Sequence, residues 1–342
     1  MEEKRVRIVG QEKGSYRISD SNEIKIAEVS GKFIYNARTL SDYPAVGDYA
    51  VTLWSDDDSN SVITALYPRR SCFIRKASGS NQEQVVAANI DTVFICMSLN
   101  NNYNLRRLER YISITYDSGA TPVVILTKAD LCDDVDEKIY EVKACSIGVD
   151  VIAISSINDE FDEVYKYITS GKTIAFIGSS GVGKSTLINK LIGSDAILTS
   201  SIGDRDRGRH TTTHRELIEL SNGAFVIDTP GMRELGMWDN ESGIESAFSD
   251  IEALAETCKF SNCTHTNEPG CAIIKALQDN TLDYERFESY LKLKKENAFI
   301  TNEKEYLEAK NAKYKEISKI NKANRKRSKC GNVLNVEESL KI

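Results

Sequence analysis

The order of two motifs along the chain constrains its fold more strongly than any other feature. An apolar run ends in the tetrapeptide Thr127-Lys128-Ala129-Asp130, and about fifty residues later the segment 178–185 reads Gly-Ser-Ser-Gly-Val-Gly-Lys-Ser. The second segment is a complete match to the phosphate-loop pattern G-x-x-x-x-G-K-[ST]. Nucleotide-binding domains that carry both motifs ordinarily place the phosphate loop first. The inverted order therefore predicts a circularly permuted α/β domain.

The phosphate loop stands in the sequence context that its motif requires. The apolar run 173–177 before it is typical of a buried parallel strand, and residues 185–191 after it read as the start of a helix. Backbone N–H groups of such a loop surround phosphate oxygens, and the helix N-terminus adds a favourable partial charge. We expect Lys184 to reach the terminal phosphates and Ser185 to bind Mg²⁺. The predicted nucleotide-binding residues here are Gly178, Ser179, Ser180, Gly181, Val182, Gly183, Lys184, Ser185 and Thr186.

The tetrapeptide at 127–130 predicts which base is bound. The carboxylate of Asp130 can accept hydrogen bonds from N1–H and the 2-amino group of guanine, whereas adenine offers neither donor there. Each such charge-assisted bond contributes about 1.5–3 kcal/mol, and Lys128 can lay its aliphatic stem over the purine. A second strand-like run, 151–154, ends in two serines, where a further base-contacting loop is expected. The predicted base-binding residues, which favour GTP over ATP, are Thr127, Lys128, Ala129, Asp130, Ser155 and Ser156.

The residues predicted to act at the γ-phosphate follow the phosphate loop. The apolar run 224–227 leads into a D-x-x-G turn, in which Asp228 would bind Mg²⁺ through water and the Gly231 amide would contact the γ-phosphate. Between the phosphate loop and the D-x-x-G turn lies a stretch rich in glycine and charged residues. This stretch ends in a histidine and three threonines. One of these threonines is expected to supply a further Mg²⁺ ligand, and the sequence leaves the choice between Thr212 and Thr213 open.

The residue after Gly231 indicates an unusual catalytic group. Many GTPases carry a glutamine there that orients the attacking water, but this chain has Met232, which is a poor hydrogen-bonding group. His210, beside the predicted threonine ligand, is the candidate catalytic residue because imidazole titrates near physiological pH. A solvated loop histidine is the alternative. Without the glutamine we expect slow intrinsic turnover, about 10⁻³–10⁻⁴ s⁻¹ as in unstimulated small GTPases, and activation by a partner.

Three cysteines and a histidine toward the C-terminal end predict a zinc site. Cys258, Cys263, His265 and Cys271 form the pattern C-x4-C-x-H-x5-C. Four such ligands suit the tetrahedral preference of Zn²⁺ and leave no position for water, which favours one structural zinc over a catalytic one. The Pro-Gly pair before the last cysteine would turn the chain back toward the metal. Disulfide bonds within the cluster are the alternative.

The remaining cysteines favour a reducing compartment. Cys72, Cys96, Cys132 and Cys145 lie in or beside apolar segments and are expected to be buried free thiols. The N-terminus lacks a signal-peptide core, and no apolar run approaches the roughly 20 residues needed to span a bilayer. We therefore expect a cytoplasmic protein with no membrane partner.

The motif order resembles that of the bacterial RsgA family of ribosome-assembly GTPases, also called YjeQ or YloQ. Five motifs follow one another along the chain: T-K-A-D, S-S, G-S-S-G-V-G-K-S, G-R-H-T-T-T and D-T-P-G. The string G-R-H-T-T-T around His210 is distinctive of that family. The resemblance implies an OB-type N-terminal domain, a permuted GTPase domain and a C-terminal zinc domain whose ligands match the cluster above. It also implies action late in maturation of the small ribosomal subunit, GTP hydrolysis stimulated by that subunit, and catalysis by His210.

The N-terminal region reads as short alternating strands. Five or six such strands suit a small barrel, and strand number alone leaves an OB-fold, an SH3-like barrel or an inert spacer open, whereas the resemblance favours the OB-fold. The predicted strands are 6–9, 16–18, 24–29, 33–35, 49–53 and 62–66. The expected multidomain architecture is an OB-fold β-barrel over 1–70, a circularly permuted α/β P-loop GTPase domain over 71–240, and a mostly α zinc-binding domain with a basic helical tail over 241–342.

Positive charge is concentrated near the C-terminal end. The chain has a net charge of −7, yet residues 292–329 contain thirteen Lys and Arg against five Glu. A basic helical segment can neutralise RNA phosphates, although a solvated helix face is the alternative for 292–320. We expect the small ribosomal subunit with its rRNA, and GTP or GDP, as partners of a monomer.

Three functions compete at this point. The first is a GTPase that is activated by the ribosome and acts in its assembly. The second is an RNA-binding module that holds nucleotide with negligible turnover, and the third is a generic P-loop ATPase or kinase. Because the phosphate-loop, magnesium and guanine motifs are all intact, the first is favoured.

Overall fold

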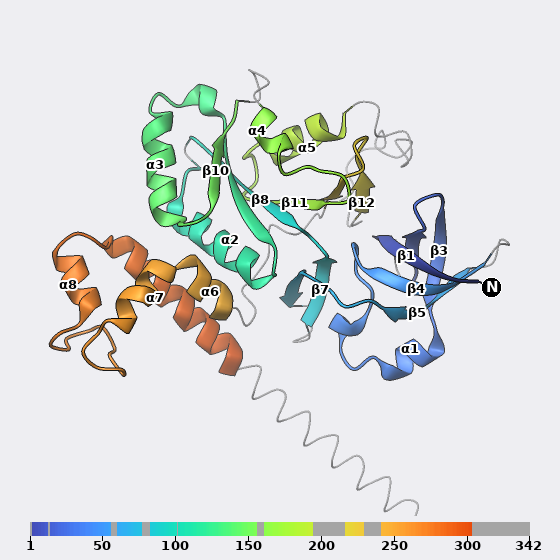
Figure 1. Cartoon of the computed structure of the whole chain (residues 1–342), viewed down its shortest axis with the longest axis horizontal. Helices are drawn as coiled ribbons and strands as arrows, with labels where there is room; N and C mark the ends of the chain where they lie inside the picture. Colours follow the sequence, from blue (N-terminus) through green and yellow to red (C-terminus); the bar gives the residue numbers. More distant parts are fainter. Residues whose placement is uncertain are drawn as a thin grey trace, which may run out of the picture. The chain divides into compact units, whose positions relative to one another are not determined.

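The computed structural model describes residues 2–12, 14–55, 60–76, 83–100, 102–155, 161–193, 216–228 and 241–302 (Figure 1). The chain divides into two compact units, residues 1–294 and 295–342. All the contacts described below lie within the first unit. The bounds of the three domains expected from the sequence stay a prediction.

The N-terminal strands close into a five-stranded barrel. The strands are β1 (Glu2–Gln11), β2 (Tyr16–Ser19), β3 (Ile24–Val29), β4 (Tyr49–Trp54) and β5 (Ser61–Leu66). Their order is β1-β2-β3-β5-β4, and β4 pairs with β1 to close the ring. Strands β3 and β5 are parallel, whereas the other neighbours are antiparallel. This is the Greek-key barrel of an OB-fold, as predicted.

One predicted strand of this region is a helix. Residues 33–35 lie in α1 (Gly31–Asn36), between β3 and β4. The hydroxyl of Ser30 accepts a hydrogen bond from the backbone N–H of Phe33 at 3.1 Å and caps the helix N-terminus. Phe33 packs against the barrel core, which consists of Val6, Ile8, Tyr16, Ile18, Ala27, Ala50, Trp54 and Ile63. The prediction was wrong because three alternating residues are too short a pattern to outweigh a serine cap.

The central sheet is mostly parallel and has the phosphate-loop strand in its interior. Its strands are β8 (Thr92–Ser98), β9 (Thr121–Thr127), β10 (Asp150–Ala153), β11 (Thr173–Ile177), β12 (Glu216–Glu219) and β13 (Phe225–Asp228). In space they run β10-β9-β8-β11-β13-β12, with only β12 antiparallel to its neighbour. The phosphate-loop strand β11 therefore lies centrally, and the carboxyl ends of the parallel strands share one edge, where ligands bind in such sheets.

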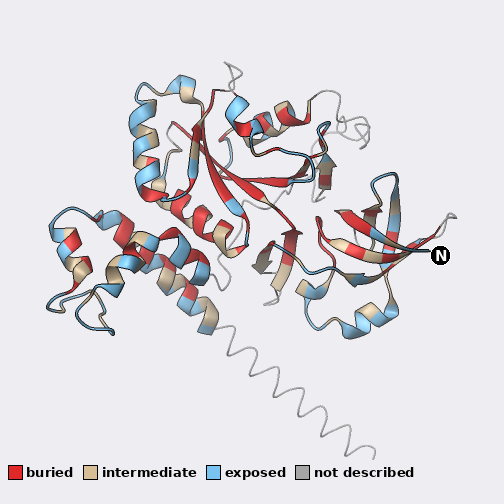
Figure 2. Cartoon of the chain, viewed as in Figure 1, coloured by how far each residue is buried: buried red, intermediate tan, exposed pale blue. Residues whose placement is uncertain are grey.

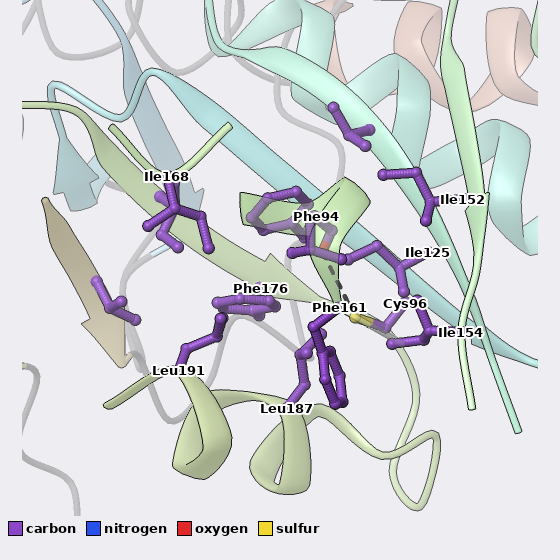
Figure 3. Packing of buried hydrophobic residues seen from close by; sticks show 14 of the residues in the cluster. Phe94, Cys96, Ile125, Ile152, Ile154, Phe161, Ile168, Phe176, Leu187 and Leu191 are labelled. Carbon is purple, nitrogen blue, oxygen red and sulfur yellow. Dashed lines mark hydrogen bonds between the residues drawn. The ribbon is translucent and has the colours of Figure 1, made fainter. Parts of the chain in front are cut away.

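Helices flank this sheet and enclose an apolar core. They are α2 (Leu105–Asp117), α3 (Val135–Cys145), α4 (Asp162–Tyr165) and α5 (Lys184–Ile192). The strands β8, β9 and β11 are buried along most of their length (Figure 2). Phe94 and Phe176 pack against Leu187 and Leu191 of α5, and Phe161 closes the same cluster (Figure 3). This packing fixes α5, and with it the phosphate loop, on the sheet.

The expectation of four buried thiols holds for two of them. Cys96 and Cys145 are buried, and burial raises the pKa of each thiol to about 12. Cys72 and Cys132 are only half-buried, because Cys72 lies in the two-stranded ribbon of β6 (Cys72–Lys76) and β7 (Glu83–Ala88), and Cys132 follows the loop after β9. All four are free cysteines.

The barrel adjoins the central sheet through β1. Gly10 of β1 pairs with Glu216 of β12, so the two sheets are continuous. The Arg7 guanidinium donates to the hydroxyl of Thr173 at 2.5 Å and lies 4.4 Å from the ring centroid of Phe225. Arg7 thus connects the barrel to two strands of the sheet.

The C-terminal part of the first unit is helical. It contains α6 (Glu241–Ala247), α7 (Ser249–Glu256), α8 (Ala272–Gln278) and the helical residues 284–294. Helix α6 packs on α2 at Gly243, where a Cβ would lie 2.2 Å from the carbonyl oxygen of Ser113, so only glycine fits. None of the helices in the described residues combines the length and apolar character of a membrane span.

A buried arginine joins these helices to α2 and α3. The Arg286 guanidinium, 4% exposed, donates to both carboxylate oxygens of Asp250 at 2.6 and 3.0 Å and to Glu109 at 2.9 Å. It also donates to the main-chain oxygens of Cys145 and Ala247. Burial opposes the charged form, but the bonds to Asp250 and Glu109 outweigh it, so the pKa of Arg286 is raised. Removing one partner of such a buried pair costs about 3–5 kcal/mol, because the other charge is left buried and uncompensated.

Candidate nucleotide-binding site and metal centre

The phosphate loop, residues 178–185, connects β11 to α5. Gly178, Gly181 and Gly183 have φ values of +140°, +77° and +95°, in the region that favours glycine. A Cβ on Gly178 would lie 2.3 Å from the carbonyl oxygen of Cys96, so glycine is required there. The Lys184 ammonium donates to the main-chain oxygens of residues 178 and 179 at 2.6 and 2.5 Å. The lysine side chain therefore lies against the loop from which it is expected to reach a phosphate.

The predicted guanine loop lies directly against the phosphate loop. The Thr127 hydroxyl donates to the main-chain oxygen of Val182 at 2.5 Å, and the Lys128 ammonium donates to that of Gly181 at 2.9 Å. Lys128 has φ +61°, which turns the chain sharply after β9. Two motifs that are about fifty residues apart in the sequence thus form one continuous site.

The candidate base-recognising carboxylate is held by a neighbouring strand end. The Ser155 hydroxyl, on a residue that is 1% exposed, donates to Oδ1 of Asp130 at 2.9 Å. The backbone N–H of Ala129 donates to the carbonyl of Ile154 at 3.2 Å, which joins the same two strand ends. Asp130 itself is exposed. Ser155 therefore fixes one carboxylate oxygen and leaves Asp130 accessible to a ligand.

A third loop, which the sequence did not predict, also contacts the phosphate loop. Asn102 Nδ2 donates to the main-chain oxygen of Ser180 at 3.3 Å, and Arg107 in α2 donates to the hydroxyl of Ser179. The signal that could have indicated it is the run of asparagines at 100–104 after an apolar strand, since side chains at strand ends face the ligand edge of such a sheet.

The remaining predicted residues lie largely outside the described ranges. Asp228 ends β13, beside the phosphate-loop strand, and only its backbone is described. Ser185 and Thr186 are exposed in the first turn of α5. The predicted residues outside the described part of the chain are Ser156, His210, Thr212, Thr213 and Gly231.

The predicted metal ligands converge on one point. The ligand atoms of Cys258, Cys263, His265 and Cys271 all lie within 4.8 Å of one another. His265 Nδ1 is 3.6 and 3.5 Å from the sulfurs of Cys258 and Cys271, which are 3.9 Å apart. Zn–S and Zn–N bonds of about 2.3 and 2.0 Å place tetrahedral ligands about 3.5–3.8 Å apart. The cluster can therefore hold a metal, and its donor atoms and spacing fit zinc.

The chain around this cluster is shaped to present the ligands. Backbone N–H groups of Ala272 and Ile274 donate to the sulfurs of Cys258 and Cys271 at 3.4 and 3.5 Å. Such bonds favour thiolates, the form that binds metal. Gly270 has φ +79° and packs against Lys259, so it supplies the turn predicted before the last cysteine.

Metal removal is expected to unfold the segment between α7 and α8. Without metal, converging thiolates repel one another, so we expect Cys263→Ser to lose zinc and to lower the melting temperature by several degrees. Zinc content per chain and thermal unfolding measure both effects, and Cys132→Ser is the control that should retain zinc. A wild-type protein free of bound metal, with the same melting temperature before and after chelation, would contradict the structural role.

The sequence of this chain matches that of a known protein family. The model of the RsgA GTPase family matches residues 66–238, half of the length of the chain. The chain belongs to the RsgA GTPase family. The resemblance noted from the motifs is thereby confirmed.

Two curated members of the RsgA family are similar over most of the chain. The small ribosomal subunit biogenesis GTPase RsgA 2 of Lactiplantibacillus plantarum is 48% identical over 295 residues, which cover 86% of this chain and 83% of that protein. The small ribosomal subunit biogenesis GTPase RsgA of Methanosarcina acetivorans is 45% identical over 259 residues, which cover 75% of this chain and 70% of that protein.

Two solved RsgA-type structures share the fold. The crystal structure of YloQ, described as a circularly permuted GTPase, superposes with a TM-score of 0.62 at 26% identity, covering 88% of this chain and 96% of that one. YjeQ from Thermotoga maritima superposes with a TM-score of 0.65, covering 87% of this chain and 99% of that one. At 23% identity this likeness shows the fold alone.

Proposed function

We propose that this protein hydrolyses GTP during late maturation of the small ribosomal subunit and is activated by that subunit. The observation that carries the proposal is the junction of the guanine loop with the phosphate loop through Thr127 and Lys128. The printed names of the relatives, small ribosomal subunit biogenesis GTPases, support the choice of partner.

The proposed nucleotide site uses three groups of residues. Residues 178–186 would surround the phosphates, while Lys128 and Asp130 would hold guanine together with the 155–156 loop. Exposed Ser185 would bind Mg²⁺ directly and Asp228 through water, because both offer the oxygen ligands that Mg²⁺ prefers. The bound ion would neutralise charge on the β- and γ-phosphates.

The proposed catalytic group is His210, which would orient or deprotonate the attacking water. The support is the sequence alone: Met232 occupies the position where many GTPases have a glutamine, and His210 precedes the threonines that are candidate Mg²⁺ ligands. We propose Thr212 or Thr213 as that ligand. The Gly231 amide would contact the γ-phosphate.

The proposed ribosomal contacts are made by the barrel and the basic tail. On the barrel, the Arg5 guanidinium lies 4.4 and 5.1 Å from the ring centroids of Tyr49 and Tyr67, which gives a surface where cation and aromatic side chains alternate. Such surfaces bind RNA backbone and bases. The metal is proposed to be one structural zinc, and the protein a cytoplasmic monomer.

Subunit binding is expected to depend on the nucleotide. If GTP orders the contact surface and hydrolysis relaxes it, more protein should sediment with purified small subunits in a GTP analogue than in GDP, by about tenfold in apparent affinity. Lys184→Ala, which should no longer distinguish the nucleotides, is the control. Equal sedimentation of the wild type in both nucleotides would contradict the nucleotide-dependent release.

A further inference from the structure

We propose that Arg107 is the positioning residue of the phosphate loop. It acts through Ser179 rather than on the nucleotide, and the proposal rests on the proposed function because it assigns a role within the same site. Helix α2 carries this arginine in its first turn, next to the ligand edge of the sheet. Nothing in the phosphate-loop motif itself requires an arginine from another element.

The contacts of Arg107 form a short bridge between two loops. Its Nη1 donates to the hydroxyl of Ser179 and, at 2.8 Å, to Oδ1 of Asn102. The amide of Asn102 then donates to the main-chain oxygen of Ser180 at 3.3 Å. Two consecutive residues of the phosphate loop are therefore held from one side by a charged group and its amide partner.

The first turn of α2, which carries Arg107, is itself held by hydrogen bonds. The side chain of Asn104 caps the helix by accepting the backbone N–H of Arg107 at 2.8 Å, and its own N–H contacts the sulfur of Met97 at 3.3 Å. The cavity between this turn and Ser179 has a volume of only about 10 Å³. The turn therefore packs closely against the phosphate loop, and the bond from Arg107 to Ser179 joins the two.

Arg106 and Glu109, on either side of Arg107 in α2, are linked to the C-terminal helices. Arg106 donates to Glu109 at 2.8 Å, and Arg286 donates to the same carboxylate oxygen at 2.9 Å while it binds Asp250 of α7. Helix α2 thus contacts the phosphate loop at Arg107 and is linked through Glu109 and Arg286 to α7, the helix that precedes the metal cluster. Arg107 is the residue through which this anchoring reaches the nucleotide site.

Loss of Arg107 is expected to weaken nucleotide binding without unfolding the protein. A hydrogen bond from a charged group is stronger than one between neutral groups, and a loop that must be ordered at binding lowers affinity. We expect Arg107→Ala to raise the Kd for fluorescent GDP and for a GTP analogue about tenfold. Lys143→Ala, an exposed lysine in α3, is the charge-matched control and should bind like the wild type.

A double-mutant cycle separates positioning from a general loss of stability. Ser179→Ala removes the acceptor of the bond, so it should raise Kd to a similar extent, and the double variant should bind no more weakly than either single variant. Thermal unfolding and zinc content should be unchanged in all of them. Wild-type affinity in Arg107→Ala, or effects of the two substitutions that multiply, would overturn this proposal alone. A wild-type protein that binds no guanine nucleotide would overturn the proposed function, and this proposal with it.

Discussion

Asp130→Asn is expected to change the base that the protein binds from guanine to xanthine. The carboxylate would accept hydrogen bonds from N1–H and the 2-amino group of guanine, but an asparagine presents an N–H to one of these donors. Xanthine has a carbonyl in place of the 2-amino group, so the asparagine amide can donate to it. Each bond to the charged group contributes about 1.5–3 kcal/mol, so we expect GDP affinity to fall by about 100-fold.

The contact that holds Asp130 can be kept when the residue is replaced by asparagine. The Ser155 hydroxyl holds Oδ1 at 2.9 Å, and it can hold the amide oxygen of asparagine in the same way. Competition of fluorescent GDP with GDP, ADP and xanthosine diphosphate measures the selectivity. Asp133→Asn, exposed three residues later, is the matched control and should keep the preference for guanine. Unchanged GDP affinity in Asp130→Asn would contradict the assigned base site.

Local motifs made much of the fold and the site predictable from the sequence. The phosphate loop requires glycine at Gly178 because the backbone of Cys96 approaches it, and that requirement appears directly in the sequence pattern. The strands beside both loops are continuous apolar runs, which indicate buried parallel strands wherever they occur. The four metal ligands lie within fourteen residues, so their convergence needs little tertiary information.

The residues that the sequence did not reveal act through tertiary contacts. Arg107 and Asn102 reach the phosphate loop only because β8 and β11 are neighbours in the sheet. Arg286 is one of many charged residues in a helical segment, and nothing nearby in the sequence distinguishes the one that binds Asp250 and Glu109 in the interior. Pairings between distant elements are not encoded in local periodicity, so such residues require the fold.

Small ribosomal subunits are expected to raise the rate of GTP hydrolysis by about 100-fold or more. Intrinsic turnover should be slow because Met232 cannot orient water, and the small subunit is expected to accelerate the step in which His210 is proposed to act. General acid–base catalysis contributes about 10²–10⁴-fold, so His210→Ala should remove most of the stimulated rate. The same variant should bind GTP as tightly as the wild type, because the proposed role of His210 is in hydrolysis and not in nucleotide binding.

The measurement that tests the account most directly is phosphate release from GTP and from ATP, with and without purified small subunits. The account predicts strong stimulation with GTP alone, and its loss in His210→Ala. Stimulation that persists in His210→Ala would keep the function but assign catalysis to another group. Turnover that small subunits leave unchanged, or that proceeds equally with ATP, would contradict a ribosome-activated GTPase.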